Sequence, residues 1–458
     1  MDIEQAKRRQ FVKVAISETC MVFAVIALVV ILILITSGYW INQNFEVERA
    51  GLLQVSSIPT GADLEIDGEN GGFFQRTNTS KMVASGEHTV RVSREGYDSW
   101  VKTVNVREGL LYRLHYARLF LNDRTVEKII NYGAAEMSSV SPKHDLLLVF
   151  DGGMMDLLNL NSDKVVPTRI DYKQYFPTLT ASAIKTIKWS ANEEKVLIQT
   201  ADDWLLVNLK NPNESLKLST LFNTTFEKVT IADDSANTLY VVEKNNLRKV
   251  NISAKTISEI LVENVINYDF YGNEIIYVAT DTKSTFVGIL SNNKNTKIVE
   301  VSTKTYANLS KFYNDTYLTI VDGKQVILYG GKLPTSMDDN DIFEEGLSFT
   351  LDFVPEKIKL GHNGEFYLFQ NADQIAVLDM EALEIVPYKI ETTKFDWLDT
   401  DMIYVVSDGN LIVYDYDGYN RREIAQNVSE KFDVTITEDK WLYYFSDGYL
   451  VRENLLPR

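Results

Sequence analysis

The chain has 458 residues, of which 45% are hydrophobic and 24% charged, a composition typical of globular proteins and long enough for two or three domains. Its single cysteine, Cys20, excludes an internal disulfide framework. The formal net charge is −18, yet residues 1–50 hold five basic and five acidic residues, and residues 51–120 hold eight of each. The remainder therefore carries the whole net charge, which argues against a nucleic-acid partner and permits a cationic one.

An uncharged segment between Glu18 and Glu46 predicts a transmembrane helix over residues 19–41, because a bilayer span needs about 20 apolar residues. Basic residues precede this span: Lys7, Arg8, Arg9 and Lys13. The positive-inside rule then places residues 1–18 in the cytoplasm and residues 42–458 outside. Tyr39 and Trp40 fit an aromatic belt at the outer interface. A cleaved signal peptide ending near residues 36–38 is the alternative, but the apolar run is longer than the usual signal-peptide core.

A short linker, residues 42–52, is expected to lead into a small β-module over residues 53–120. Ala62, Leu64 and Ile66 alternate with acidic residues, and this period of two is typical of a half-buried strand. Asp67-Gly68 follows as a hairpin turn signal. Further alternating segments continue through "SGEHTVRVSREGYDSWVKTVNVREG".

This module resembles the PEGA domain, a small β-sandwich of prokaryotic envelope proteins. The residues that carry the resemblance fall in the family's order: Pro59, Gly61, Ala62, Asp67, Gly68, Gly72, Gly86, His88, Gly96, Tyr97 and Trp100. The resemblance implies a surface or wall-associated spacer in a bacterial envelope protein, and it gives these residues a structural role. Glycines supply positive φ angles at turns, while Tyr97 and Trp100 offer large apolar faces to a small core.

Residues 121–458 contain a recurring unit of short strands and polar turns. The clearest second strands of the units begin at Leu146, Val196, Leu239, Ile276, Leu318, Phe366, Ile403 and Leu442. The first and last starts lie 296 residues apart over seven intervals, about 42 residues each, which is the blade length of a β-propeller. We therefore predict an all-β ectodomain, a PEGA-like sandwich plus a propeller of eight blades, on one transmembrane helix.

The turns of these units are similar to those of TolB-like propellers, as in "WSANEEKVL" and "FSDGYLV". Asp408-Gly409 and Asp447-Gly448 are predicted to close hairpins through type I′ turns, in preference to ligating a metal. The last unit offers only three strand patterns before the chain reaches Arg458. We expect residues 124–131 to supply its outer strand and to close the ring, which would remove exposed sheet edges.

Motifs for catalysis are scarce. The four histidines lie in the module or in turns, and no Gly-x-Ser-x-Gly nucleophile elbow occurs. The acidic run "MDDNDIFEEG" from Met337 departs from the EF-hand template, since Ile342 occupies a ligand position, so a solvated loop is expected there. We predict no catalytic residue, no cofactor and no metal site. Paired carboxylates for glycoside cleavage stay open, because the acidic residues of the propeller allow many pairs.

The sequence thus favours a non-catalytic cell-envelope binding or scaffold protein, held in the membrane by one span, whose propeller recognises an envelope protein or polysaccharide and no nucleic acid. The alternative is an envelope polysaccharide hydrolase or lyase acting from the central funnel of the propeller. Charged and aromatic residues gathered at the funnel mouth would favour the hydrolase, and an apolar plugged funnel would favour binding.

Overall fold

The computed structural model describes residues 3–36, 38–41, 47–70, 76–271, 274–312, 315–331, 344–361, 364–372, 374–389, 394–438 and 441–456. These residues form two compact units, one made of residues up to 124 with 455–456, and one made of residues 125–454.

The first unit begins with the helix α1 (Ile3–Thr36). Its segment Ile16–Leu34 has a mean hydropathy of 2.7 and is exposed, so it is long and apolar enough to cross a membrane. The helix ends five residues before the predicted end of the span. Gly38 follows with φ of 80°, a conformation that does not continue a right-handed helix. The next residues, Tyr39–Ile41, form strand β1 instead, as their aromatic and β-branched side chains favour.

The sheets of this unit begin earlier than the sequence predicts. Strand β1 pairs with β2 (Val47–Ile58), so part of the expected linker 42–52 is strand. One sheet has the order β1-β2-β5, with β8 also paired with β2, and the other has the order β4-β3-β6-β7. Their further strands are β3 (Asp63–Ile66), β4 (Glu69–Asn70), β5 (Thr79–Ala84), β6 (Gly86–Ser93), β7 (Trp100–Val106) and β8 (Leu111–Arg118).

The core of the sandwich joins the two sheets. Trp100 on β7 is 0% exposed, and its ring meets the ring of Tyr116 on β8 edge to face at 5.9 Å. Leu53 from one sheet and Leu64 from the other are also buried. An aromatic pair of this size supplies much of the apolar burial available to so small a module.

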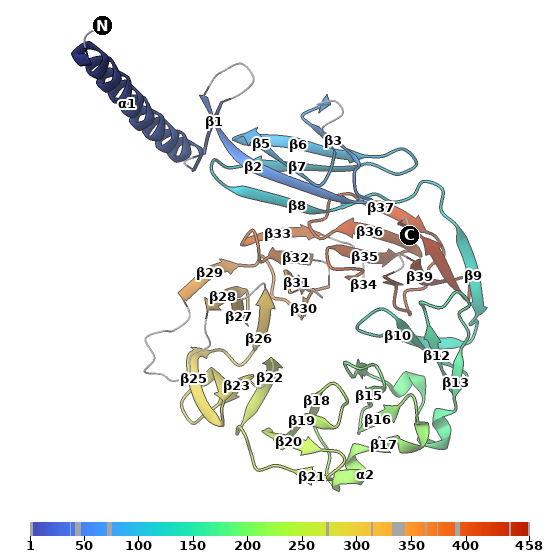
Figure 1. Ribbon diagram of the computed structural model, residues 1–458. Helices are drawn as coiled ribbons and strands as arrows, with labels where there is room; N and C mark the ends of the chain where they lie inside the picture. The colour runs from blue at the N-terminus through green and yellow to red at the C-terminus, as the bar shows by residue number, and fades with distance from the viewer. Residues whose placement is uncertain are drawn as a thin grey trace. The chain divides into compact units, whose positions relative to one another are not determined.

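The described residues of the second unit form eight four-stranded antiparallel sheets that follow one another around a ring (Figure 1). The first four comprise β10 (Ala135–Val140), β11 (Leu146–Asp151), β12 (Met154–Asn159) and β13 (Thr168–Ile170); β14 (Thr186–Trp189), β15 (Lys195–Gln199), β16 (Trp204–Asn208) and β17 (Leu216–Lys217); β18 (Lys228–Ile231), β19 (Thr238–Glu243), β20 (Asn246–Asn251) and β21 (Thr256–Ile257); β22 (Val265–Tyr271), β23 (Glu274–Thr280), β24 (Thr285–Ser291) and β25 (Lys294–Val301). The last four comprise β26 (Thr305–Phe312), β27 (Asp315–Asp322), β28 (Gln325–Gly331) and β29 (Glu344–Thr350); β30 (Lys357–Leu360), β31 (Phe366–Gln370), β32 (Gln374–Asp379) and β33 (Glu384–Lys389); β34 (Lys394–Trp397), β35 (Met402–Ser407), β36 (Asn410–Asp415) and β37 (Arg422–Ala425); β38 (Thr435–Ile436), β39 (Trp441–Ser446), β40 (Tyr449–Asn454) and β9 (Val126–Asn131). A short helix α2 (Leu218–Phe222) follows β17.

The eighth sheet combines segments from both ends of the unit. Strand β9 pairs antiparallel with β40, so that Ile130 lies opposite Leu450 and Val126 opposite Glu453. An ion pair between Arg452 and Glu127, 2.8 Å from nitrogen to oxygen, adds a side-chain link between the same two strands. The edge of the last sheet is therefore paired within the chain.

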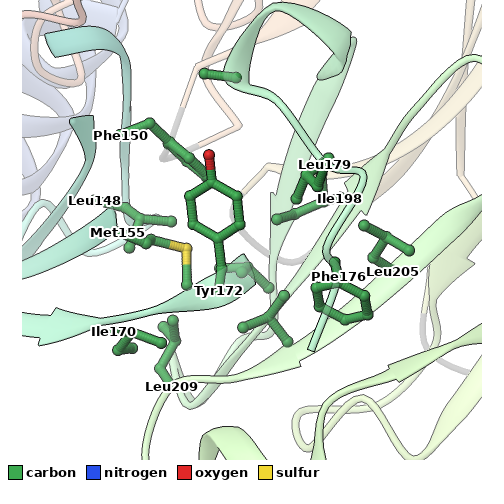
Figure 2. Packing of buried hydrophobic residues seen from close by; sticks show 13 residues of the cluster. Leu148, Phe150, Met155, Ile170, Tyr172, Phe176, Leu179, Ile198, Leu205 and Leu209 are labelled. Atoms are coloured by element: carbon green, nitrogen blue, oxygen red, sulfur yellow. The ribbon is translucent and has the colours of Figure 1, made fainter. Parts of the chain in front are cut away.

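The second strand of each sheet packs on both faces, which explains why these strands read as continuous apolar runs. In β11, Leu148 and Phe150 enter the cluster shared with the next sheet, shown in Figure 2, where Tyr172 and Phe176 also pack. Leu147 enters a different cluster, shared with the eighth sheet. Successive side chains of a strand point to opposite faces, so a strand between two neighbours needs apolar residues at every position.

Turns between first and second strands repeat one geometry. The amides of Ser141, Ser190 and Gly361 donate to the carbonyl five residues later, at 2.9, 2.9 and 2.7 Å. A residue with positive φ lies three positions into each turn: His144, Glu193 or Gly364. Both predicted hairpins are confirmed as well.

The two predicted hairpins, at Asp408-Gly409 and Asp447-Gly448, each join the second strand of a sheet to its third strand. Asp408 and Gly409 have φ of 50° and 77°, Asp447 and Gly448 have φ of 51° and 79°, and each pair joins two adjacent antiparallel strands. Positive φ at both central residues is the signature of a type I′ turn.

Candidate functional site in the central channel

The innermost strands β10, β14, β18, β22, β26, β30, β34 and β38 face the axis of the ring, and polar side chains join each sheet to the next. The links are Trp189 Nε1 to Ser139 Oγ at 2.9 Å, Lys188 Nζ to the Val229 carbonyl at 2.8 Å, Lys228 Nζ to the Tyr268 carbonyl at 3.2 Å, Asn308 Nδ2 to Asp269, Tyr367 OH to Asn308 Oδ1 at 2.7 Å, Lys359 to Asp396, Lys394 Nζ to Asp433 Oδ1 at 2.8 Å, and the Asp433 amide to Ser138 Oγ at 2.9 Å. All eight neighbouring pairs of sheets are thus joined. We call this set the inter-sheet ring.

Three charged residues in one arc of the inter-sheet ring, Lys188, Lys228 and Asp269, are buried enough to shift their pKa values. Burial, with a smaller contribution from the charge of Lys188, lowers the pKa of Lys228 to about 8, although Asp269 opposes the change. Burial also lowers the pKa of Lys188. The pKa of Asp269 is raised by burial, against hydrogen bonds from the Phe270 amide and Asn308 and the charges of the two lysines. Desolvation thus weakens the charged forms in this arc.

The opposite arc encloses a hollow of about 490 Å³ on the face that carries the turns between first and second strands. Its lining comprises Val140, Ser141, Pro142, His144, Ile187, Trp189, Lys359, Leu360, Asp396, Trp397, Tyr404, Asp433 and Val434. Lys359 and Asp396 contribute an ion pair to this lining, and Asp433 contributes a carboxylate whose partner Lys394 lies outside it. Three large aromatic rings also contribute. The hollow therefore combines apolar surface with a few fixed polar groups, as ligand pockets do.

Two side chains of the hollow stand out. His144 Nδ1 lies 2.5 Å from Thr435 Oγ1, so the imidazole is held by a hydrogen bond between the first and eighth sheets. Trp397 is 5% exposed, and its side-chain Nε1 has no hydrogen-bond partner within the described part of the chain. An unpaired buried N–H costs about 1–3 kcal/mol.

The same face has acidic turns around the hollow. In the described turns between first and second strands, seven acidic residues have exposed or partly exposed side chains, and the one lysine is Lys143. We call these seven the acidic rim: Asp145, Glu193, Glu194, Asp233, Asp234, Asp399 and Glu438. Glu194 pairs with Lys210 from an outer turn. The rim gives the mouth of the hollow a negative potential, whereas the lysine–aspartate pairs at the hollow balance each other.

The residues predicted for the PEGA-like module are distributed over its turns and core. Asp67 accepts hydrogen bonds from His88, at 2.6 Å, and from the Thr89 amide, at 2.8 Å, so its carboxylate ties the hairpin to β6. The guanidinium of Arg94 lies 5.8 Å from the Tyr97 ring centroid. Positive φ is found at Gly61, Gly68, Gly86 and Gly96, Pro59 follows β2, and Ala62 and Trp100 are buried; Gly72 lies outside the described residues.

The other predicted positions lie elsewhere. Lys7, Arg8, Arg9 and Lys13 are on α1, and Tyr39 and Trp40 are on β1. Most of the acidic run from Met337 lies outside the described residues, as does His362. The channel lysines were missed by the sequence analysis, which followed the second strands. Each lysine stands 7 to 11 residues before a predicted second-strand start, and that spacing is the signal that could have found them.

The fold defines an all-β chain with one apolar N-terminal helix, a small sandwich and a ring of propeller-type sheets. Residues 50–118 match the PEGA domain family. No curated protein matches the chain. Among solved structures, the computationally designed Ika8 protein is 10% identical with a TM-score of 0.44, covering 72% of this chain and 100% of that one. Kluyveromyces lactis Hsv2 is 9% identical with a TM-score of 0.42, covering 64% and 98%. Apo AztD from Citrobacter koseri is 13% identical with a TM-score of 0.39, covering 75% and 92%.

Proposed function

We propose that this chain is a non-catalytic binding or scaffold protein of the cell envelope, anchored by α1 with its N-terminus in the cytoplasm and both β-units outside. The propeller presents the recognition surface, and the PEGA domain acts as a spacer. The partner is an envelope protein or polysaccharide. The match of residues 50–118 to the PEGA domain supports an envelope role, and the apolar segment Ile16–Leu34 supports the anchor.

The observation that carries the proposal is the pairing of two channel carboxylates with lysines. Asp396 and Asp433 each accept a hydrogen bond from a lysine of the neighbouring sheet. A glycosidase needs two carboxyl groups available to the glycosidic bond, one of them protonated at working pH. The lysine partner of each carboxylate occupies part of its hydrogen-bonding surface. These groups therefore suit a rigid ring better than acid–base catalysis, which supports binding over hydrolysis.

A membrane tether agrees with this role. Only ten residues separate the end of α1 from the start of β2, so the sandwich follows the proposed anchor after a short connection. A partner fixed in the membrane or wall gains from a high effective concentration, whereas a diffusible substrate needs no such tether.

The test uses the full-length chain in lipid nanodiscs, incubated with isolated wall glycans and with detergent-solubilised envelope proteins. Retention on the immobilised chain and release of soluble saccharide fragments are scored in parallel, with empty nanodiscs as the control. We expect stable retention of a protein or polysaccharide without fragment release. Fragment release above the control, without retention, would overturn the proposal in favour of the hydrolase.

A further inference from the structure

Building on the proposed binding role, we propose that the hollow and its acidic rim form the recognition site for a basic segment of a polypeptide partner, with a lysine or arginine side chain inserted among the aromatic rings. The partner class follows from the charge, shape and hydrogen-bonding groups of this part of the channel.

The charges around the hollow favour a cationic ligand. Two ion pairs lie at the hollow, Lys359 with Asp396 and Lys394 with Asp433, and their formal charges cancel. Lys394 itself is not part of the lining. Among the described residues of these turns, Lys143 is the one lysine that opposes the seven carboxylates of the acidic rim. An approaching ligand therefore meets a negative mouth above a neutral interior, which steers cations inward and repels anionic polymers.

The aromatic rings of the lining also favour a cationic side chain. Trp189, Trp397 and Tyr404 line the hollow. The face of an aromatic ring attracts an ammonium or guanidinium group, most strongly for tryptophan and when water is excluded. A hollow of about 490 Å³ has room for one long basic side chain and its adjoining backbone. Neutral sugars would use the rings but gain nothing from the rim.

The unpaired N–H donor of Trp397 favours a ligand that carries a hydrogen-bond acceptor. Trp397 is nine-tenths buried in the wall of the hollow, and its Nε1 lacks an acceptor among the described residues. A backbone carbonyl of an inserted segment would accept from this N–H after a small rotation of the ring. A polypeptide supplies such a carbonyl beside every basic side chain, whereas a polyamine carries no oxygen acceptor. The donor thus favours a peptide over a polyamine.

The experiment measures binding of a fluorescein-labelled decapeptide of alternating lysine, arginine and serine to the full-length chain in nanodiscs by fluorescence anisotropy. Two variants carry the same charge change at different places: Glu193→Lys with Glu438→Lys on the acidic rim, and Asp202→Lys with Glu259→Lys in exposed turns on the other face. Thermal unfolding of each variant checks that it folds. We expect the rim variant to bind about tenfold more weakly than the wild type and the control variant to bind within about twofold of it.

A third variant tests the aromatic wall. Trp189→Leu is expected to weaken peptide binding about three- to tenfold, because a cation loses the face of an indole. An equal loss in the rim and control variants would overturn the site, since the peptide would then follow net charge alone. Preference for a glucosamine hexamer over the peptide would overturn the partner class. Either result leaves the proposed binding role standing if the nanodisc retention assay still captures an envelope macromolecule.

Discussion

The ammonium of Lys394 on β34 lies 2.8 Å from the carboxylate of Asp433, just before β38, and so joins the seventh sheet to the eighth. Both side chains are about one-third exposed or less. The pair belongs to the inter-sheet ring, in which the contacts of each sheet depend on its neighbours. Polar contacts around the axis therefore complement the apolar clusters that lie between the sheets.

Replacing this lysine tests the ring. Lys394→Met leaves Asp433 without its lysine partner, and we expect the free energy of unfolding to fall by about 1–2 kcal/mol in a urea titration. Adding Asp433→Leu should recover part of the loss, since no orphan carboxylate remains. The control is Lys210→Met, which removes a 72% exposed partner of Glu194 and should cost under about 0.5 kcal/mol. Equal losses at both lysines would show that the ring adds nothing to stability.

Strand β9 allows a matched comparison of two positions. Ile130 is partly buried and packs against the cluster between the eighth and first sheets, whereas Val126 on the same strand is 56% exposed. Ile130→Asp should lower stability by about 2–4 kcal/mol, because a charge then enters an apolar cluster. Val126→Asp should change it by less than about 0.5 kcal/mol. Thermal unfolding measures both, and similar midpoints for the two variants would contradict a stabilising role of the β9–β40 pairing.

Much of the fold could be predicted because its strongest signals are local. Eight apolar runs such as "LLLVF" mark strands buried on both faces, and Asp-Gly pairs mark the hairpins. The last unit offered three strands, which directed attention to residues 124–131, and the structure pairs Val126–Asn131 with Tyr449–Asn454. The end of α1 and the start of β2 escaped prediction, since Tyr39–Ile41 is as apolar as a helix end and its strand partner is visible only in three dimensions.

The channel was much harder to predict. Lys359 and Asp396 lie 37 residues apart, and Lys394 and Asp433 lie 39 apart, so each contact depends on how one sheet faces the next. Such lysines look like ordinary surface charges in the sequence. The hollow likewise collects residues from five sheets, and no local pattern joins Trp189 to Trp397.

The core of the PEGA domain depends on one aromatic residue. Trp100→Ala removes a side chain that is 0% exposed and contacts Tyr116, and we expect a loss of about 3–5 kcal/mol in the stability of that unit. Val101→Ala, one residue along the same strand and 38% exposed, is the control and should cost less than about 1 kcal/mol. Limited proteolysis should cut the tryptophan variant within residues 47–118 before it cuts the control. Equal resistance of the two variants would show that the core tolerates the cavity.

Acid should weaken the hairpin at Asp67. Burial raises the pKa of this carboxyl, but hydrogen bonds from His88 and the Thr89 amide outweigh burial and lower the pKa below its ordinary value. A carboxyl with a lowered pKa stabilises the fold above its unfolded pKa, and that stability is lost as the pH falls through the folded value. Asp67→Asn should therefore flatten the stability of the unit between about pH 5 and pH 3. A wild-type and a variant curve that stay parallel over this range would contradict the role of the carboxylate.

Raising the pH into the alkaline range should increase the contribution of Lys228 to the stability of the fold. Its pKa is lowered to about 8 in the folded chain, whereas an unfolded lysine titrates near about 10.4. Between these two values the unfolded state binds more protons, so the contribution of this lysine to stability rises with pH. The stability of the wild type relative to Lys228→Met should therefore increase from pH 7.5 to pH 9.5, as urea titrations at about four pH values would show. The same comparison with Lys210→Met, at a largely exposed lysine, serves as the control. If both lysine variants showed the same dependence of stability on pH, desolvation in the channel would be too weak to lower the pKa of Lys228. This arc of the inter-sheet ring would then have to be hydrated.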